Sequence, residues 1–233
     1  MKESIYTIPI SEVFEPRCGC PICTLHTTLE TRWVDYITGA AMMEPDIRIE
    51  TNKEGFCPRH FDMMLAQRNR LSVALILQSR LEHLNNTLTD IKSPKKGLFG
   101  GGDSTPESDC FVCGKIDREF DRIADNIVTV WGRDQSFREL YTGQEFLCYP
   151  HYKILVQAAK RALKGKQQEL FVEESAILTR NKLEEAKKNI DQFCNLFDYR
   201  SAGAGKPSDE VSAAIESAIA YLGGTSSTPE DEK

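Results

Sequence analysis

The sequence has no long hydrophobic run and no excess of positive charge. A membrane-spanning helix needs about 18 or more consecutive apolar residues, so the chain predicts none. Residues 1–16 are too polar and acidic for a secretory signal peptide. The formal net charge of −6 disfavours non-specific binding to nucleic acid, which requires clustered Lys and Arg. We therefore expect a cytoplasmic protein with neither membrane nor nucleic acid as its partner.

Alternation of apolar and polar residues, the pattern typical of a half-buried strand, is also scarce. The best candidates are short extended segments at residues 47–51 and just before Cys148. No motif of a catalytic nucleophile or base stands out, so the sequence argues against an enzyme without excluding one. At 233 residues with 40% hydrophobic residues, the chain is long and apolar enough to bury a core.

Cysteine, in contrast, is abundant, and its spacing repeats. Eight cysteines in a cytosolic chain of this size indicate metal or redox chemistry rather than disulfides. Two Cys-x-x-Cys pairs are each followed by a Cys-x-x-His pair, 34 residues later in the first half and 35 residues later in the second. The predicted ligand sets are Cys20, Cys23, Cys57 and His60 for one ion, and Cys110, Cys113, Cys148 and His151 for the other.

Three thiolates and one imidazole fill the four corners of a tetrahedral zinc site. Because no coordination position stays open, we expect two structural zinc ions rather than catalytic ones. Iron–sulfur clusters use similar cysteine sets and are the less favoured alternative. A redox role of the Cys-x-x-Cys pairs is also less favoured, because the βαβ context of thioredoxin-like proteins is missing. Residues 44–56, if extended, could span about 43 Å and bring the chain back to the first pair.

Apolar residues at steps of three and four predict helices with buried stripes. They include Leu25, Leu29, Trp33 and Tyr36 in one stretch, Leu77, Leu81, Leu84 and Leu88 in a second, and Ile116, Phe120, Ile123 and Ile127 in a third. Further helices are predicted near residues 183–197 and 209–222. The predicted fold is all-α, a pseudo-symmetric helical bundle of two repeats, each pinned by a Cys-x-x-Cys and Cys-x-x-His metal site.

Proline, glycine and polar residues without apolar periodicity predict a flexible linker between the repeats. The expected division is a first metal-binding repeat at 1–93, the linker at 94–109, a second metal-binding repeat at 110–165, C-terminal helices at 166–223 and a disordered tail at 224–233. Cys18 has Ser108 as its counterpart in the second half and is interpreted as a spare thiol. Cys194 is interpreted as a packing residue.

Hydrogen-bonding side chains also gather in two short segments without helical periodicity. They are Arg48, Thr51 and Asn52 in the first segment and Asp198, Tyr199 and Arg200 in the second. Because function often lies in loops on a rigid scaffold, we predict a site for a ligand, cofactor or partner where they meet. The alternative is internal, with Arg48 paired to a carboxylate and Asn52 capping a turn.

Five segments occur in a fixed order along the chain. They are CPIC (20–23), EPDIRIETNKEGFCPRHF (44–61), FVCGKID (111–117), FLCYPHYKIL (146–155) and FDYRS (197–201). Together they resemble an uncharacterised bacterial family defined only as a domain of unknown function. The resemblance covers nearly the whole chain and implies no known activity or substrate.

Two functions follow as hypotheses. The first is a zinc-stabilised helical protein that acts as an adaptor or binds a ligand, with an unknown protein or small molecule as its partner. The alternative is a metal- or redox-responsive regulator whose thiolates lose their metal on oxidation.

Overall fold

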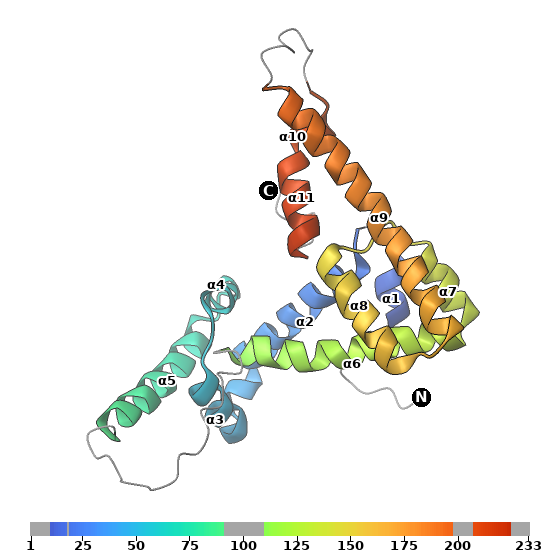
Figure 1. The fold of residues 1–233 in the computed structure, drawn as a ribbon. Helices are drawn as coiled ribbons and strands as arrows, with labels where there is room; N and C mark the ends of the chain where they lie inside the picture. The colour runs from blue at the N-terminus through green and yellow to red at the C-terminus, as the bar shows by residue number, and fades with distance from the viewer. Residues whose placement is uncertain (1–9, 18, 91–109, 198–206, 225–233) are drawn as a thin grey trace, which may run out of the picture. The chain divides into compact units, whose positions relative to one another are not determined.

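The computed structural model describes residues 10–17, 19–90, 110–197 and 207–224 (Figure 1). Every regular element in these ranges is helical, and none of their residues forms a strand, so the predicted all-α fold is confirmed. None of the described helices combines the length and apolar character needed to cross a membrane. The predicted linker at 94–109, the tail from 225 onward and Cys18 lie outside the described residues.

The chain divides into two compact units. Unit 1 comprises residues 1–26 and 121–233, and unit 2 comprises residues 27–120. The boundaries fall inside two long helices, α2 (Pro21–Thr38) and α6 (Phe111–Arg133), so each of these helices contributes residues to both units. The expected division placed the boundary between two repeats at the linker, residues 94–109, whereas the two units are bounded within α2 and α6.

Unit 1 is organised around α9 (Lys166–Asn195), its longest helix. The other complete helices are α1 (Ile10–Phe14), α7 (Gln135–Thr142), α8 (Tyr149–Ala162), α10 (Asp209–Ser212) and α11 (Ala214–Gly223). Helix α9 contacts α7, α8, α10 and α11, and α11 also contacts α8 (Figure 1). The end of α11 is thereby held near the start of α8, which matters for the metal centre described below.

Aromatic side chains form the core of unit 1. The ring of Tyr141 lies 5.9 Å from that of Phe14 and 5.3 Å from that of Phe171, whose centroid is 5.0 Å from Trp131. The Tyr141 hydroxyl is 2.6 Å from Ser175 Oγ, so its polar atom is satisfied inside the core. This cluster joins α1, α6, α7 and α9 through large buried surfaces.

Unit 2 contains η1 (Ala40–Met43), α3 (Pro45–Glu54), α4 (Pro58–Ala66) and α5 (Arg70–Asp90), together with parts of α2 and α6. Its core includes Val34, Ile37, Phe56, Met64, Val73, Ile76 and Phe111. The extended segment expected at residues 47–51 is wrong, because these residues are part of α3. Pro45 stands in the first turn of α3, where its missing N–H costs no helical hydrogen bond. Gly55 then ends the helix with φ +70°, a conformation that favours glycine.

The predicted apolar stripes are buried on two helices and exposed on a third. Leu25, Leu29 and Ile116 are buried as expected. The stripe of α5 is exposed, with Leu77, Leu81, Leu84 and Leu88 between 37% and 65% accessible. Cys194, expected to pack, is also exposed. Helix α5 buries residues of its first half, Val73 and Ile76 among them, because its contacts are with α3, α4 and η1. Periodicity revealed an apolar face on α5 but not whether a neighbour covers it.

Candidate metal centres

All four cysteine motifs occupy the same position, the start of a helix. Cys20 and Cys110 directly precede α2 and α6, while Cys57 and Cys148 are the N-cap residues of α4 and α8. The second ligand of each motif follows three residues later, in the first helical turn. The N-cap and third helical side chains project from the same side of that turn, as they do in a capping box. The x-x spacing therefore directs both ligand atoms of a motif to one point.

Two groups of four side chains result. Centre 1 consists of Cys20, Cys23, Cys148 and His151, and centre 2 consists of Cys57, His60, Cys110 and Cys113. In each centre the four ligand atoms lie within 4.8 Å of one another. The side chains of each centre come from the starts of two helices, α2 and α8 in centre 1 and α4 and α6 in centre 2.

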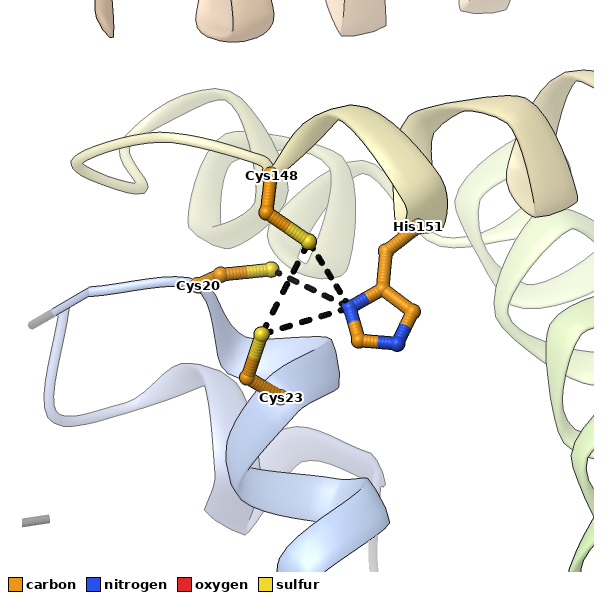
Figure 2. A group of neighbouring side chains, drawn as sticks. All are labelled: Cys20, Cys23, Cys148 and His151. Atoms are coloured by element: carbon orange, nitrogen blue, oxygen red, sulfur yellow. Dashed lines mark hydrogen bonds between the residues drawn. The ribbon is translucent and has the colours of Figure 1, made fainter. Parts of the chain in front are cut away.

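The sulfur atoms of Cys20, Cys23 and Cys148 converge on Nδ1 of His151 in centre 1 (Figure 2). Nδ1 of His151 is 3.7 Å from Cys20 Sγ, 3.3 Å from Cys23 Sγ and 3.0 Å from Cys148 Sγ. Cys23 Sγ and Cys148 Sγ are 3.7 Å apart. All four residues are buried.

Centre 2 has the same internal geometry. Nδ1 of His60 lies 3.1 Å from both Cys57 Sγ and Cys110 Sγ, and 3.5 Å from Cys113 Sγ. Cys57 Sγ and Cys113 Sγ are 4.0 Å apart. Cys110 and His60 are buried, whereas Cys57 and Cys113 are partly exposed.

These distances fit one tetrahedral ion in each centre. Two thiolates, each about 2.3 Å from such an ion, are separated by about 3.8 Å, and a thiolate and an imidazole nitrogen by about 3.6 Å. The observed S···S distances of 3.7 and 4.0 Å match the first value. The S···N distances run from 3.0 to 3.7 Å, and all but the longest are shorter than the second value. The residues present can therefore hold a metal ion with small adjustments.

The predicted pairing of the motifs is wrong, although the eight ligands are the predicted ones. Each centre combines the Cys-x-x-Cys pair of one half with the Cys-x-x-His pair of the other. Helix α2 is 18 residues long and carries the chain about 27 Å away from Cys20 and Cys23. An extended return could have covered that distance, but the 10-residue helix α3 advances only about 15 Å. The chain therefore reaches Cys57 without returning to the first pair.

Further hydrogen bonds join the two chain segments that meet at each centre. The Gly19 N–H donates to Glu145 Oε2 at 2.7 Å, which links the residues preceding α2 and α8. The Phe111 N–H donates to the Gly55 carbonyl oxygen at 2.9 Å, which links the start of α6 to the residues preceding α4. The helix starts are thus placed by main-chain contacts as well as by the ligands themselves.

Centre 2 has a carboxylate behind its histidine. Nε2 of His60, the ring nitrogen remote from the thiols, is 3.1 Å from Glu30 Oε1, although without the alignment of a regular hydrogen bond. Arg59 donates to both carboxylate oxygens of Glu30, at 2.6 and 2.7 Å. Burial alone would raise the pKa of Glu30, but His60 and Arg59 outweigh it and lower the pKa to about 2. Glu30 is therefore an anion next to the centre.

Centre 1 is covered instead by the end of α11. The Gly224 carbonyl oxygen, directly after this helix, lies 3.3 Å from Cys23 Sγ. Gly224 has φ +73°, and a Cβ there would contact Pro150 of the α8 first turn at 3.4 Å. The ring of His26 lies 6.4 Å from that of His151 between centroids. Tyr221 holds α11 in place by donating its hydroxyl to the Thr179 carbonyl oxygen at 2.9 Å.

Within each centre, a thiolate at one cysteine raises the pKa of a neighbouring thiol. Burial would raise the pKa of Cys110, but His60 and the neighbouring thiols lower it to about 6. Burial and the Cys110 thiolate raise the pKa of Cys113 to about 12. In centre 1 the hydrogen-bonded Cys20 thiolate raises the pKa of Cys148 to about 12. A divalent cation bound among the thiols would allow all of them to be deprotonated, because each thiolate would then face positive charge.

A comparison with protein families identifies what kind of chain this is. The model of DUF6062, a family of unknown function, matches residues 1–229. The chain belongs to this family. No curated protein and no solved structure matches it. The resemblance to a domain of unknown function is therefore confirmed. The comparisons assign no activity to the DUF6062 chain.

The other predicted site falls partly outside the described residues, which exclude Asp198, Tyr199 and Arg200. In unit 2, the Thr51 hydroxyl donates to the Arg48 carbonyl oxygen at 3.2 Å, and Asn52 Oδ1 accepts from Ser79 Oγ at 2.9 Å. Arg80 also donates to the main-chain carbonyl oxygen of Asn52. These contacts stabilise α3 and its junction with α5, which supports an internal role. A ligand site at this position stays a prediction.

Sequence reasoning missed Glu30 and Arg59. Glu30 belongs to neither cysteine motif and stands on α2, in a sequence position that suggests only a polar helical face. Arg59 stands between the two candidate ligands of its motif, but a long charged side chain at that place can equally be solvated. Identifying its partner required the tertiary structure.

Proposed function

We propose that the DUF6062 chain is a zinc-stabilised helical protein in which one structural ion holds each unit together. The observation that carries this proposal is the convergence of three thiols and one imidazole within 4.8 Å in both units, each time from the starts of two helices. In a structural site these four ligands complete a tetrahedron and leave no position for a substrate. Each ion then substitutes for apolar packing between helix starts.

Zinc is the ion that the ligands suit best. Thiolates and imidazole bind zinc well, whereas magnesium and calcium require oxygen ligands. An iron–sulfur cluster would insert several iron and sulfide atoms between its ligands. The S···S distances of 3.7 and 4.0 Å leave room for a single ion, which argues against a cluster.

The biological role proposed for this scaffold is to bind a protein or small-molecule partner as an adaptor. Two closed metal centres support a structural rather than a catalytic use of the ligands. The exposed leucines of α5 offer apolar surface of the kind found at interaction sites. Thiolates persist in a reducing compartment, which supports a cytoplasmic location.

A metal- or redox-responsive regulator is the second candidate, and the partial exposure of Cys57 and Cys113 favours it. Their sulfur atoms are 4.0 Å apart in centre 2. Hydrogen peroxide would oxidise the two thiolates to one disulfide. The two electrons released, together with two protons, would reduce the peroxide to two water molecules, and the ion would leave the centre. Such a reaction would make centre 2 a sensor.

Elemental analysis of the full chain tests the main proposal. We expect about two zinc ions per chain after purification under reducing conditions in the presence of zinc. Substitution by cobalt should give the intense visible absorption of tetrahedral cobalt thiolate sites. A Cys194→Ser variant serves as the matched control, because Cys194 lies outside both centres and should leave the metal content unchanged.

The outcomes separate the alternatives. A metal content near zero would falsify zinc stabilisation, and bound iron with sulfide would replace zinc by a cluster. Peroxide added in substoichiometric steps distinguishes scaffold from regulator. Release of one ion with a disulfide between Cys57 and Cys113 supports the regulator, whereas retention of both ions supports the scaffold alone.

A further inference from the structure

We propose that Glu30 is a positioning residue of centre 2, which fixes the imidazole of His60 with Nδ1 toward the metal ion. This inference rests on metal binding at centre 2. It adds a residue that lies outside the cysteine motifs and is carried by a different helix from all four ligands of that centre.

The orientation of the His60 ring is the first observation. Nδ1 lies 3.1 to 3.5 Å from the three sulfur atoms of centre 2, and Nε2 lies 3.1 Å from Glu30 Oε1. The ring is almost fully buried, so bulk water does not compete for either nitrogen. A metal on Nδ1 would leave the proton on Nε2, and a small rotation of the ring or of the carboxylate would align that N–H with Glu30 Oε1, which is already within reach at 3.1 Å. Histidine ligands are commonly held this way, and the anionic acceptor makes the imidazole a stronger ligand.

The second observation is the clamp that Arg59 completes. Its guanidinium donates through Nε and Nη2 to the two oxygens of Glu30, and this bidentate contact fixes the plane of the carboxylate. Glu30 is only 2% exposed, so its charge is stabilised by these neighbours rather than by water. Arg59 and His60 are adjacent in the first turn of α4. One carboxylate on α2 therefore holds both the ligand and the turn that carries it.

The corresponding residues of the other motifs carry no such charges. Glu30 stands seven residues after Cys23, and the residue seven positions after Cys113 is Phe120. Arg59 precedes a ligand histidine, and Pro150 takes this place before His151. Neither phenylalanine nor proline can form a carboxylate–guanidinium pair. At these two positions the sequence therefore offers the carboxylate and the guanidinium of the clamp in the first half of the chain and not in the second.

Zinc transfer to a chromophoric chelator tests the role of Glu30 in the full-length zinc-loaded protein. In Glu30→Gln we expect one of the two ions to be released about 10- to 100-fold faster than in the unsubstituted protein, if the typical 10- to 100-fold loss of metal affinity on removing such a partner is expressed in the release rate. Alkylation during release followed by peptide mass spectrometry should show that Cys57, Cys110 and Cys113 become reactive first. Glutamine keeps the size of the side chain, so the substitution removes mainly the charge.

Glu174→Gln is the matched control. Glu174 also accepts from an arginine and an aromatic side chain, Arg138 and Trp131, but it lies in unit 1 and belongs to neither centre. It should lower thermal stability without accelerating the release of one ion selectively. Equal acceleration in both variants would mean that Glu30→Gln acts through general destabilisation, and this would overturn the proposal.

Nuclear magnetic resonance gives a second readout that a merely structural role would not change. The ring nitrogen shifts of His60 should show metal on Nδ1 and a protected proton on Nε2, and Glu30→Gln should lose that protection. Should Glu30→Gln fail to fold, Arg59→Gln provides the test, since the Arg59 side chain is 62% exposed and its loss leaves the carboxylate in place. We expect it to accelerate release of the same ion by a smaller factor.

The failures are distinguishable. An unsubstituted protein without zinc would refute the proposed function, whereas two bound ions with unchanged release from both Glu30→Gln and Arg59→Gln would refute only the role of Glu30.

Discussion

Centres 1 and 2 share their ligand types and their helix-start geometry, yet their surroundings differ. Centre 1 is fully buried, with the end of α11 against Cys23. Centre 2 exposes part of Cys57 and Cys113 and has a buried carboxylate behind its histidine. The ligand motif therefore determines how an ion is coordinated, whereas the neighbouring residues determine how readily solvent, chelators and oxidants reach it.

This difference suggests a division of labour within one scaffold. The buried centre 1 is suited to permanent stabilisation of unit 1, beside a core of aromatic side chains. The more accessible centre 2 is suited to exchange, and the Glu30 clamp would limit that exchange by strengthening the histidine ligand.

Cleavage between the halves tests the cross-pairing of the motifs. A protease site introduced between residues 94 and 109 would separate the motifs at Cys20 and Cys57 from those at Cys110 and Cys148. Because each centre takes ligands from both fragments, the cleaved zinc-loaded protein should elute as one species on a native sizing column. A strong chelator should then weaken or abolish the association. Cleaved fragments that separate while each retains zinc would show that the ligands pair within halves.

Loss of a thiol should be more damaging in centre 1 than in centre 2. Structural zinc contributes an apparent ~10–16 kcal/mol in small peptides, which is comparable to the ~5–15 kcal/mol by which whole domains are stable. Cys148→Ser should therefore bind one ion fewer, and unit 1 should no longer show a cooperative unfolding transition. Cys57→Ser should bind its ion more weakly but keep more structure, because water can occupy the partly exposed position. Zinc analysis and thermal unfolding by circular dichroism measure both effects, and equal losses would contradict the comparison.

Thiol labelling should rank the two centres by accessibility. With limiting maleimide and a mild chelator, we expect Cys194 to react first, as an exposed thiol outside both centres. Cys57 and Cys113 should follow, and the three buried thiols of centre 1 should react last. Peptide mass spectrometry over a time course gives the order. Earlier modification of Cys20 or Cys148 than of Cys57 would reverse the assignment of the exchangeable centre.

Removal of one hydroxyl should weaken the cover of centre 1 slightly. Tyr221→Phe deletes the hydrogen bond that anchors α11 to α9, which typically costs about 0.5–1.5 kcal/mol. We expect a small decrease in the melting temperature and modestly faster labelling of Cys23, which the end of α11 contacts. Labelling of Cys57 in centre 2 serves as the internal reference and should not change.

Much of the site could be predicted because its chemistry is local. A thiol or imidazole at the N-cap and third positions of a helix projects to one side whatever the rest of the chain does, so the x-x spacing identified the eight side chains that gather in the two centres. The stripes around Leu25 and Ile116 likewise predicted buried helical faces. The α5 stripe was misjudged because burial depends on a neighbour, which periodicity does not describe.

What the sequence by itself determined is the helical fold, the eight candidate ligands and the family of the chain. The tertiary structure decided which motifs share an ion, because the path of the chain through α2 and α3 depends on whether residues 45–54 fold as a helix or extend. It also decided the partner of His60, since Glu30 and His60 meet through the packing of α2 against the start of α4. The residues that can share an ion within one motif follow from their short spacing in the sequence. Which distant motifs come together depends on the length and direction of the helices between them.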